Sequence, residues 1–319
     1  MKIVVTGGAG FIGSHLCTRL LDEGHNVQCV DNFITGSELN IASLRKHPHF
    51  SCIYQDVTRP FEFEADAIFH LASPASPVGY MEYPIETILV NSQGTYQMLE
   101  QARKQNAIFL VASTSEAYGD PLVHPQREDY WGNVNPIGPR ACYDESKRVG
   151  ETLTMEYHRQ YGLNARIVRI FNTYGPNSQI NDGRMIPNFI TQALRNEPLT
   201  IYGDGGITRS ICYVSDLVEG LIRALFQPRT AGEVFNLGHI EEHTVLEYAQ
   251  LIIRLCEASS GIIFEPNRVD DPERRRPDIS KAHSVLGWEP KLSIEAGLRR
   301  TIEWFKWFSN YISQPIPAL

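Results

Sequence analysis

The stretch that decides the fold opens the chain and reads Met1-Lys2-Ile3-Val4-Val5-Thr6-Gly7-Gly8-Ala9-Gly10-Phe11-Ile12-Gly13. Residues 3–6 are all β-branched, which predicts a buried strand, and residues 11–24 carry apolar side chains at helical spacing. Glycines between a strand and a helix permit a tight turn and let backbone N–H groups approach a diphosphate at the positive end of the helix dipole. The segment therefore predicts the first unit of a dinucleotide-binding sheet, with the cofactor against Gly7, Gly10, Phe11, Ile12 and Gly13.

A carboxylate after the second predicted strand selects the cofactor. Asp31 follows residues 26–30 and lies 18 residues beyond Gly13. Its carboxylate can accept hydrogen bonds from ribose hydroxyls and would repel a 2′-phosphate, and no arginine follows it immediately. NAD is therefore predicted rather than NADP. Further residues near strand ends are predicted to complete the cofactor site: Asn32, Asp56, Val57, Leu71 and Ser73.

The first half of the chain alternates strands with helices. This alternation predicts an α/β fold of Rossmann type, a doubly wound parallel sheet covered on both faces. The predicted strands are residues 2–6, 26–30, 50–54, 65–70, 107–113 and 165–170, and the predicted helices are residues 11–24, 85–106 and 143–161.

Beyond residue 170 the regular alternation of strands and helices ends. This change predicts a smaller, discontinuous C-terminal lobe that binds the substrate. The elements expected there are a helix (185–196), a strand (199–202), a return to the sheet (210–213, 214–226 and 234–237), and two helices (244–258 and 293–308) around a polar, Arg-rich loop. The predicted domains are an NAD-binding domain (1–177 and 208–238), a nucleotide-sugar-binding lobe (178–207 and 239–308) and a frayed tail (309–319).

The composition limits which partners and which cellular compartment are expected for the protein. The 319 residues carry a formal net charge of -8, which disfavours nucleic acid and anionic membranes as partners. No stretch approaches the roughly 18 apolar residues of a membrane span, and no signal peptide is expected before the first strand. The six cysteines form no Cys-x-x-Cys pair and the ten histidines form no metal-binding motif. No metal is therefore expected, and the cytoplasm is the predicted compartment.

Tyr143 and Lys147 lie four residues apart at the start of a predicted helix, and hence on one face of it. A tyrosine phenol has a pKa of about 10 and is a poor base at neutral pH. A neighbouring ammonium and the positive charge of a nicotinamide would lower that pKa, which suits the pair to oxidising an alcohol. The preceding strand ends in hydroxyls and a carboxylate. The predicted catalytic residues are Tyr143, Lys147, Thr114, Ser115 and Glu116.

These motifs resemble a known family. Gly7–Gly13, Tyr143-x-x-x-Lys147 and the strand-end Thr114 resemble the extended short-chain dehydrogenases/reductases that remodel nucleotide sugars. Longer strings are similar to the UDP-glucuronate decarboxylase (UDP-xylose synthase) family, and the resemblance covers nearly the whole chain, up to about Phe308. These strings are His70–Pro77, Ser113–Pro121, Asn135–Glu145, Arg169–Pro176, Asn181–Arg184 and Leu286–Pro290.

The resemblance implies decarboxylation of UDP-glucuronate to UDP-xylose by C4 oxidation, loss of CO2 from the 4-keto acid and re-reduction by bound NADH. It makes Tyr143 the base for the C4 hydroxyl and Lys147 the residue that holds the nicotinamide ribose. Thr114 would bond the C4 oxygen, and Glu116 with Ser115 would serve decarboxylation and reprotonation.

The resemblance also implies contacts with a UDP-sugar and with a second copy of the chain. A homodimer is expected, in which the helices over residues 85–106 and 143–161 pair with their copies. The residues expected to meet the UDP-sugar are Tyr80, Asn172, Arg184, Tyr202, Arg209 and Arg275.

One position departs from the family's pattern and keeps other reactions open. Leu89 stands where members often carry a lysine that could meet the substrate carboxylate, so Arg184 or another residue would have to supply that charge. A nucleotide-sugar 4,6-dehydratase of the dTDP-glucose type usually carries Asp where Ser115 stands. A UDP-glucuronate 4-epimerase generally lacks a carboxylate at the position of Glu116. A non-catalytic NAD-binding scaffold is disfavoured because such proteins tend to lose the tyrosine or the lysine.

Overall fold

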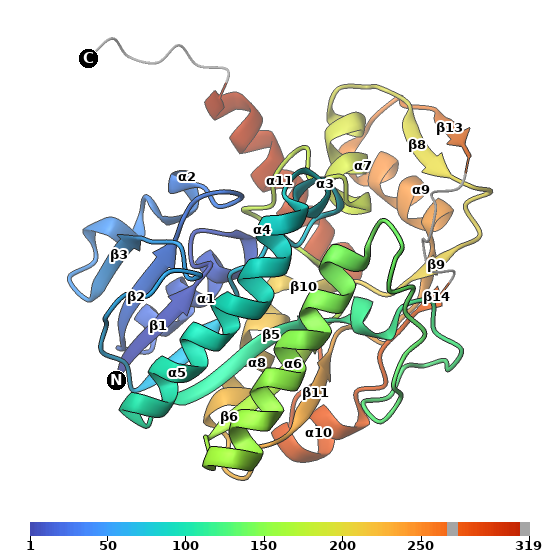
Figure 1. The fold of residues 1–319 in the computed structure, drawn as a ribbon. Helices are drawn as coiled ribbons and strands as arrows, with labels where there is room; N and C mark the ends of the chain where they lie inside the picture. Colours follow the sequence, from blue (N-terminus) through green and yellow to red (C-terminus); the bar gives the residue numbers. More distant parts are fainter. Residues whose placement is uncertain (267–273, 313–319) are drawn as a thin grey trace.

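A seven-stranded sheet forms the centre of the molecule in the computed structural model, which describes residues 1–266 and 274–312 (Figure 1). All seven strands are parallel, in the order β11-β6-β5-β4-β1-β2-β3. The order reverses between β1 and β4, where doubly wound sheets bind ligands. The predicted fold class is confirmed. The strands are β1 (Lys2–Thr6), β2 (Asn26–Asp31), β3 (Phe50–Tyr54), β4 (Ala67–His70), β5 (Ile108–Thr114), β6 (Ala165–Ile170) and β11 (Val234–Leu237).

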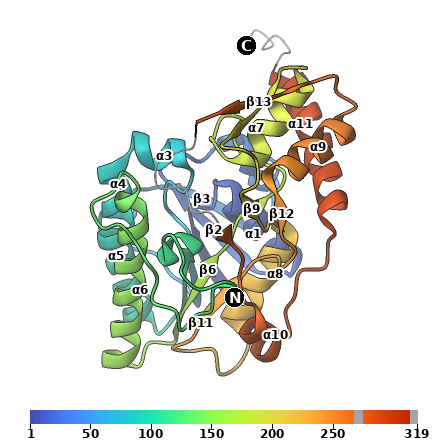
Figure 2. The ribbon, with the colours of Figure 1, turned by 90° about the vertical axis from the view of Figure 1, so that its right-hand side faces the viewer.

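Helices cover both faces of the sheet, because crossovers between parallel strands require them (Figure 2). Successive residues of a strand point to opposite faces, so Val4 packs with the helices of one face and Val5 with those of the other. One face carries α4 (Pro84–Leu89), α5 (Thr95–Gln105) and α6 (Ala141–Tyr161), and the opposite face carries α1 (Phe11–Asp22) and α8 (Val214–Phe226).

The single helix predicted over residues 85–106 is interrupted. A π turn, η2 (Val90–Gly94), separates α4 from α5. Asn91 in this turn donates from its side-chain amide to the Ser146 hydroxyl of α6 at 3.0 Å, and Gly94 packs closely enough that a Cβ would lie 3.1 Å from Val57. Helical periodicity alone does not show such a widened turn, because the apolar spacing continues across it.

The second part of the chain builds three small sheets beside the main one. β10 pairs with β7 rather than with the main sheet, so the expected return at residues 210–213 is wrong. Among the strands described beyond residue 170, β11 is the one that joins the main sheet. The helices α7 and α9 pack together, and β8 pairs with β13. The elements are β7 (Thr173–Tyr174), α7 (Met185–Leu194), β8 (Leu199–Tyr202), β9 (Thr208–Arg209), β10 (Cys212–Tyr213), β12 (His243–Thr244), α9 (Val245–Cys256), β13 (Ile262–Glu265) and β14 (Arg274–Arg275).

The C-terminal region holds more regular structure than its sequence predicts. α10 (Ser280–Leu286) lies inside the predicted polar loop, and α11 (Ile294–Ile312) runs four residues into the predicted tail. Residues 267–273 of the Arg-rich loop and residues 313–319 of the tail lie outside the described residues. Shorter elements are α2 (Glu38–Ile41), η1 (Leu44–Lys46), α3 (Pro77–Glu82) and η3 (Ser115–Tyr118). Within the described ranges, no helix is both long and apolar enough to cross a membrane.

Candidate active site

One cavity of about 500 Å³ lies along the carboxyl ends of the parallel strands and contains the whole predicted site. Strands that run in one direction place their ends at one edge of the sheet, so residues far apart in sequence meet there. Every residue predicted for cofactor binding, catalysis or substrate binding lines this cavity, from Gly7 at one end of the chain to Arg275 at the other.

The glycine loop forms one end of the cavity. Gly7 has a φ of 71°, a left-handed conformation that favours glycine. A Cβ on Gly7 would lie 2.8 Å from the backbone of Ala72, and a Cβ on Gly13 would lie 2.1 Å from the Gly7 carbonyl oxygen. Gly10 stands at the N-cap of α1 and brings no side chain to the first N–H groups of that helix. The loop therefore forms a backbone-lined cradle at a helix N-terminus, as a diphosphate site requires.

Asp31 is fixed at the wall of the cavity beside this loop. Its Oδ2 accepts a hydrogen bond from the Ala9 N–H at 2.9 Å, and its Oδ1 accepts one from the Phe33 N–H at 2.8 Å. Burial raises the pKa of Asp31, while the backbone hydrogen bonds oppose that rise. The carboxylate is thus held in place at the end of β2, where a ribose acceptor is predicted.

Tyr143 lies in the first turn of α6 and is buried against Tyr80 of α3. The two rings are stacked, with centroids 5.0 Å apart and planes inclined by 11°. Burial raises the pKa of Tyr143 above its usual value, and a hydrogen bond with the Thr114 hydroxyl only partly offsets the rise. The expected lowering by a neighbouring ammonium is not seen in the chain itself, because burial dominates.

Lys147 lies one turn further along α6. Its Nζ donates to the Ala112 carbonyl oxygen at 2.8 Å and lies 5.8 Å from the centroid of the Tyr143 ring. Burial lowers the pKa of Lys147 to about 7, against the opposing charge of Glu151. Burial therefore disfavours the ammonium form of this side chain, and the charge of Glu151 favours it.

Glu116 occupies the next position around the cavity, on η3. Arg140 donates from Nη2 to its Oε2 at 2.5 Å, and Arg275 of β14 donates from Nη1 to its Oε1. Burial alone would raise the pKa of Glu116, but the charges of Arg275 and Arg140 outweigh it and hold that pKa below its usual value. Arg275 is buried, and its Nη2 has no hydrogen-bond partner among the described residues, so it can donate to a ligand.

The far end of the cavity is built by the second part of the chain. Tyr202 ends β8 and is 37% exposed, whereas Arg209 on β9 is buried. The Arg184 guanidinium lies 5.8 Å from the centroid of the Phe11 ring and donates from Nε to the Asp182 carboxylate at 2.7 Å. Leu89, 41% exposed, also lines the cavity.

Three charged residues in or beside this site were not predicted from the sequence, and of these Arg140 lines the cavity. Arg140 pairs with Glu116, and its place three residues before Tyr143 is the signal that could have indicated it. Asp144 is buried, and burial together with the charge of Glu116 raises its pKa to about 7. Glu151 is buried one turn beyond Lys147, at helical spacing that was available in the sequence.

Residues 3–238 match the model of a family described as NAD dependent epimerase/dehydratase. The chain belongs to that family. Within this epimerase/dehydratase family, the chain is similar to UDP-glucuronic acid decarboxylase 1 of Danio rerio, with 54% identity over 95% of this chain and 72% of the relative. The predicted family resemblance is thereby confirmed.

Solved structures of similar fold carry related names. A UDP-glucuronic acid 4-epimerase from Bacillus cereus, in complex with UDP-glucuronic acid and NAD, is 31% identical over 97% of this chain and all of that chain, with a TM-score of 0.87. The dTDP-glucose 4,6-dehydratase DesIV from Streptomyces venezuelae, with NAD and TYD bound, is 29% identical over 98% of both chains, with a TM-score of 0.88. The family's fold thus serves more than one reaction, and the site has to distinguish them.

Proposed function

We propose that this chain is an NAD-dependent carboxy-lyase that converts UDP-glucuronate to UDP-xylose. The observation that carries the proposal is the Glu116 carboxylate, held by two arginines in the same cavity as Thr114 and Tyr143. Exchange of configuration at C4 needs no group that moves a proton at C5, whereas decarboxylation does. The relative at 54% identity, which is named a UDP-glucuronic acid decarboxylase, supports the same choice.

NAD is the cofactor, and the glycine end of the cavity fits it. A Cβ on Gly7 or Gly13 would collide with the chain's own backbone, so these glycines let the loop close tightly at the N-terminus of α1, and Asp31 presents a fixed carboxylate to ribose hydroxyls. When bound, NAD takes up the hydride from C4 of the sugar and gives it back. The residues proposed to hold it are Gly7, Gly10, Phe11, Ile12, Gly13, Asp31, Asn32, Asp56, Val57, Leu71, Ser73, Tyr143 and Lys147.

Tyr143 and Thr114 handle the oxygen on C4. The Tyr143 phenolate accepts the proton of the C4 hydroxyl, and the Thr114 hydroxyl that contacts the phenol orients the two oxygens. The resulting C4 ketone is β to the C6 carboxylate. The C5–C6 bond can therefore break with its electron pair delocalised onto the C4 oxygen, and CO2 leaves. Hydrogen bonds from Tyr143 and Thr114 stabilise the enolate oxygen.

Glu116 is proposed to deliver the proton that C5 must gain after CO2 has left. Its carboxylate is bonded to Arg140 and Arg275, and Ser115 is buried next to it on η3. We assign to Glu116 and Ser115 the passage of a proton from solvent to C5, and to the two arginines the orientation of that carboxylate.

The remaining residues bind the nucleotide and the sugar carboxylate. Asn172 and Arg209 are assigned to the diphosphate, Tyr202 to the uridine and Tyr80 to the sugar. Arg184 pairs with Asp182 and Arg275 pairs with Glu116, but Arg275 keeps a second nitrogen, the buried Nη2, without a partner among the described residues. Arg275 is therefore better suited than Arg184 to supply the charge that Leu89 lacks.

The test is to incubate the purified chain with UDP-glucuronate and NAD and to follow the sugar nucleotide by mass spectrometry. The proposal expects a pentose nucleotide and release of CO2, and it expects Glu116→Gln to retain NAD binding while losing most of this product. A six-carbon product of unchanged mass would indicate a 4-epimerase. Turnover of dTDP-glucose with loss of water, and none of UDP-glucuronate, would indicate a dehydratase.

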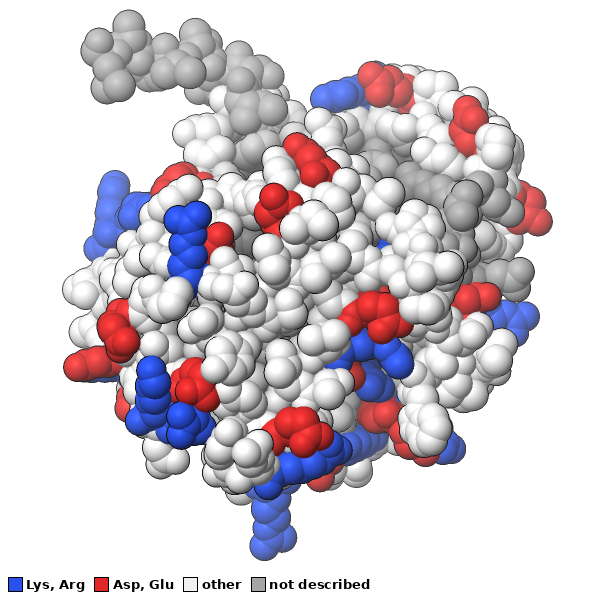
Figure 3. Space-filling view, viewed as in Figure 1, with Lys and Arg blue, Asp and Glu red and all other residues white. Residues whose placement is uncertain are grey.

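A homodimer and a cytoplasmic location belong to the proposal. The face of α4, α5 and α6 exposes apolar side chains, and its middle shows few charged groups, which gather toward its margin (Figure 3). Such a face matches an interface between two copies. All six cysteines are free thiols, which fits a reducing compartment. The exposed apolar residues on these helices include Ile85, Ile88, Leu89, Tyr96 and Val149.

A further inference from the structure

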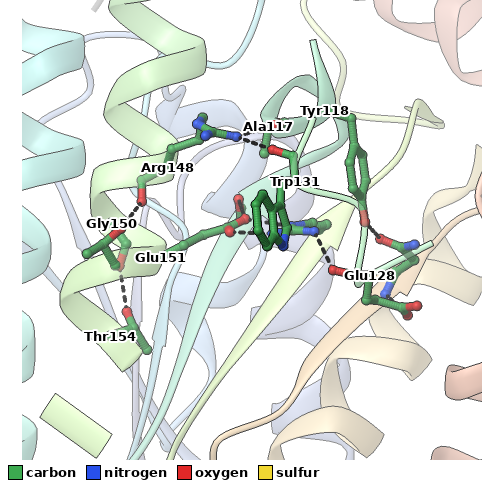
Figure 4. Close-up of polar contacts among 12 residues, drawn as sticks. Ala117, Tyr118, Glu128, Trp131, Arg148, Gly150, Glu151 and Thr154 are labelled. Atoms are coloured by element: carbon green, nitrogen blue, oxygen red, sulfur yellow. Dashed lines mark hydrogen bonds and ion pairs between the residues drawn. The ribbon is translucent and has the colours of Figure 1, made fainter. Parts of the chain in front are cut away.

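A second buried charge follows the catalytic lysine on α6. Glu151 lies four residues after Lys147, so the two side chains share a face of the helix. Glu151 is 9% exposed and reaches from α6 toward the sheet (Figure 4). A buried carboxylate costs free energy unless it is paired and hydrogen-bonded, so its partners indicate what it does.

The partners of Glu151 come from two neighbouring strands. The Ser113 hydroxyl of β5 donates to Oε1 at 2.5 Å. Arg169 of β6, which is the register partner of Ser113, donates from Nε to Oε1 at 2.9 Å and from Nη2 to Oε2 at 2.7 Å. Two-point pairing of this kind fixes both the position and the orientation of a carboxylate.

The same stretch of β5 anchors the lysine. Lys147 donates to the carbonyl oxygen of Ala112, the residue before Ser113. Lys147 and Glu151 are therefore attached to consecutive residues of one strand, which ends at Thr114 beside Tyr143. The Glu151 carboxylate and the Lys147 ammonium are thus held against the same end of β5.

The charge of Glu151 acts on Lys147. Burial lowers the pKa of Lys147, and the charge of Glu151 opposes that fall. Asp144 lies three residues before Lys147 on the same helix, but burial and the charge of Glu116 raise its pKa to about 7 and so disfavour its charged form. The other titratable groups that face this region cannot replace Glu151 either. His70 of β4 is buried and neutral at physiological pH, because burial lowers its pKa to about 3, and the Glu116 carboxylate is bonded to two arginines. Tyr143 has a raised pKa, and Arg169 is itself a cation.

We propose that Glu151 is a positioning residue, whose charge, fixed by Ser113 and Arg169, keeps Lys147 in the cationic form that makes Tyr143 a proton acceptor. The proposal rests on the proposed function, because the role of Tyr143 comes from it. Arg169 weakens this stabilisation of the ammonium, because its positive charge partly cancels the negative charge of Glu151 at Lys147.

The test is the pH profile of kcat in the Glu151→Gln variant with NAD and UDP-glucuronate. The amide keeps an acceptor for Ser113 but loses the charge, so Lys147 loses its proton at lower pH. The alkaline limb of the profile is expected to move down by about one pH unit, with kcat about tenfold lower above the limb and nearly unchanged below it. A loss of rate that is equal at every pH would overturn the proposal.

Three further variants separate charge from structure. Glu151→Asp keeps the charge and should leave the limb near its wild-type position. Thr154→Val, which removes a buried hydrogen bond to the Gly150 carbonyl oxygen on the same helix, should not move it. The double variant Glu151→Gln/Arg169→Gln removes both charges of the pair without leaving either one buried alone. It should move the limb to lower pH, by less than Glu151→Gln, so the sign of the effect can be read even where Glu151→Gln does not fold. An upward shift in the double variant would contradict the proposal.

A second readout does not depend on the sugar reaction. NMR titration of the free protein with isotope-labelled lysine follows Lys147 directly, and Glu151→Gln should lower its pKa. If the wild-type chain fails to decarboxylate UDP-glucuronate while this shift appears, the proposed function fails and the effect of Glu151 on Lys147 stands. If no shift appears, the role of Glu151 is overturned whatever the chain catalyses.

Discussion

At the scale of single residues, burial acts on Tyr143 and Lys147 in opposite senses. It raises the pKa of the phenol above its usual value and lowers the pKa of the ammonium to about 7. In the chain itself, Lys147 therefore loses its proton before Tyr143 does, although the unperturbed pKa values lie close together, at 10.5 for the lysine and 10.0 for the tyrosine. The phenolate needs further positive charge nearby, which is why a neighbouring nicotinamide cation and a cationic Lys147 both matter for the proposed reaction.

Tyr143→Phe should lower kcat by about 10²- to 10⁴-fold, because it removes the proton acceptor and leaves the ring that stacks on Tyr80. NAD affinity and thermal stability should change little. The comparison variant is Tyr80→Phe, which preserves the same stack but removes a hydroxyl assigned to the sugar, so it should raise KM more than it lowers kcat. Equal losses of kcat in the two variants, measured as turnover of UDP-glucuronate, would contradict the assignment of the proton acceptor to Tyr143.

Lys147→Met should make the protein more stable below neutral pH while abolishing activity. Burial lowers the folded-state pKa of Lys147 to about 7 from 10.5. Below pH 7 the folded state therefore bears the full free-energy cost of burying the ammonium. As pH rises toward the unfolded value, the folded state sheds the proton first and that cost disappears. Allowing for the lost hydrogen bond to Ala112, we expect the free energy of unfolding of Lys147→Met to exceed that of the wild type by on the order of 2 kcal/mol at pH 6. The two free energies should differ little at pH 10. Chemical denaturation at several pH values measures it; a difference that does not vary with pH would refute this account.

At the scale of elements, the predictions succeed where one periodicity covers a whole segment. β1, β3, β8, β11 and α8 begin and end where the sequence predicts, and each is followed by a glycine or a glutamine that marks its end. The π turn η2 and the small strands β7, β9, β12 and β14 could not be predicted, since each depends on a distant partner and is too short to show a period.

The same distinction applies to the site. Strand ends and helix spacing were enough to bring Tyr143, Lys147 and Glu116 to one cavity. Arg140 and Glu151 were missed because their significance lies in what they pair with, and a sequence shows the charge but not the partner. Helical spacing from Lys147 pointed to Glu151, but exposed glutamates at that spacing are common.

Gly13→Ala should damage the first βα unit. The added Cβ would lie 2.1 Å from the Gly7 carbonyl oxygen, so α1 or the glycine loop has to shift. We expect a loss of about 1–3 kcal/mol in stability and an NAD affinity at least about tenfold weaker. Gly261→Ala is the control, because a Cβ there meets nothing within 4 Å. Calorimetric titration with NAD measures the affinity, and wild-type binding by Gly13→Ala would show that the loop is not the diphosphate cradle.

At the scale of the whole molecule, one sheet edge joins two parts of the chain into a single site. The glycine loop, η3 and α6 come from the first half, whereas Arg209 and Arg275 come from β9 and β14, which pair with each other. The apolar face of α4, α5 and α6, in contrast, is built from the first half of the chain alone. Most of this face lies outside the cavity, although Leu89 lines it.

Val149→Glu should weaken the proposed dimer. Val149 on α6 is 44% exposed, and a carboxylate in an apolar interface would be desolvated without a partner. The matched control is Ile263→Glu on β13, which is also 44% exposed but lies away from that face. Sedimentation velocity should show the wild type and Ile263→Glu as dimers and Val149→Glu shifted to monomer. A dimer that persists in Val149→Glu would place the interface elsewhere.

The most direct test of the central claim is the isotope content of the product when the reaction with UDP-glucuronate runs in D2O. The account predicts a pentose nucleotide with one non-exchangeable deuterium, at C5, because C5 takes its proton from solvent through Glu116 while C4 regains the hydrogen that it gave up. Two deuterium atoms would mean that C4 does not recover its own hydrogen. A six-carbon product without deuterium would contradict decarboxylation by this site altogether.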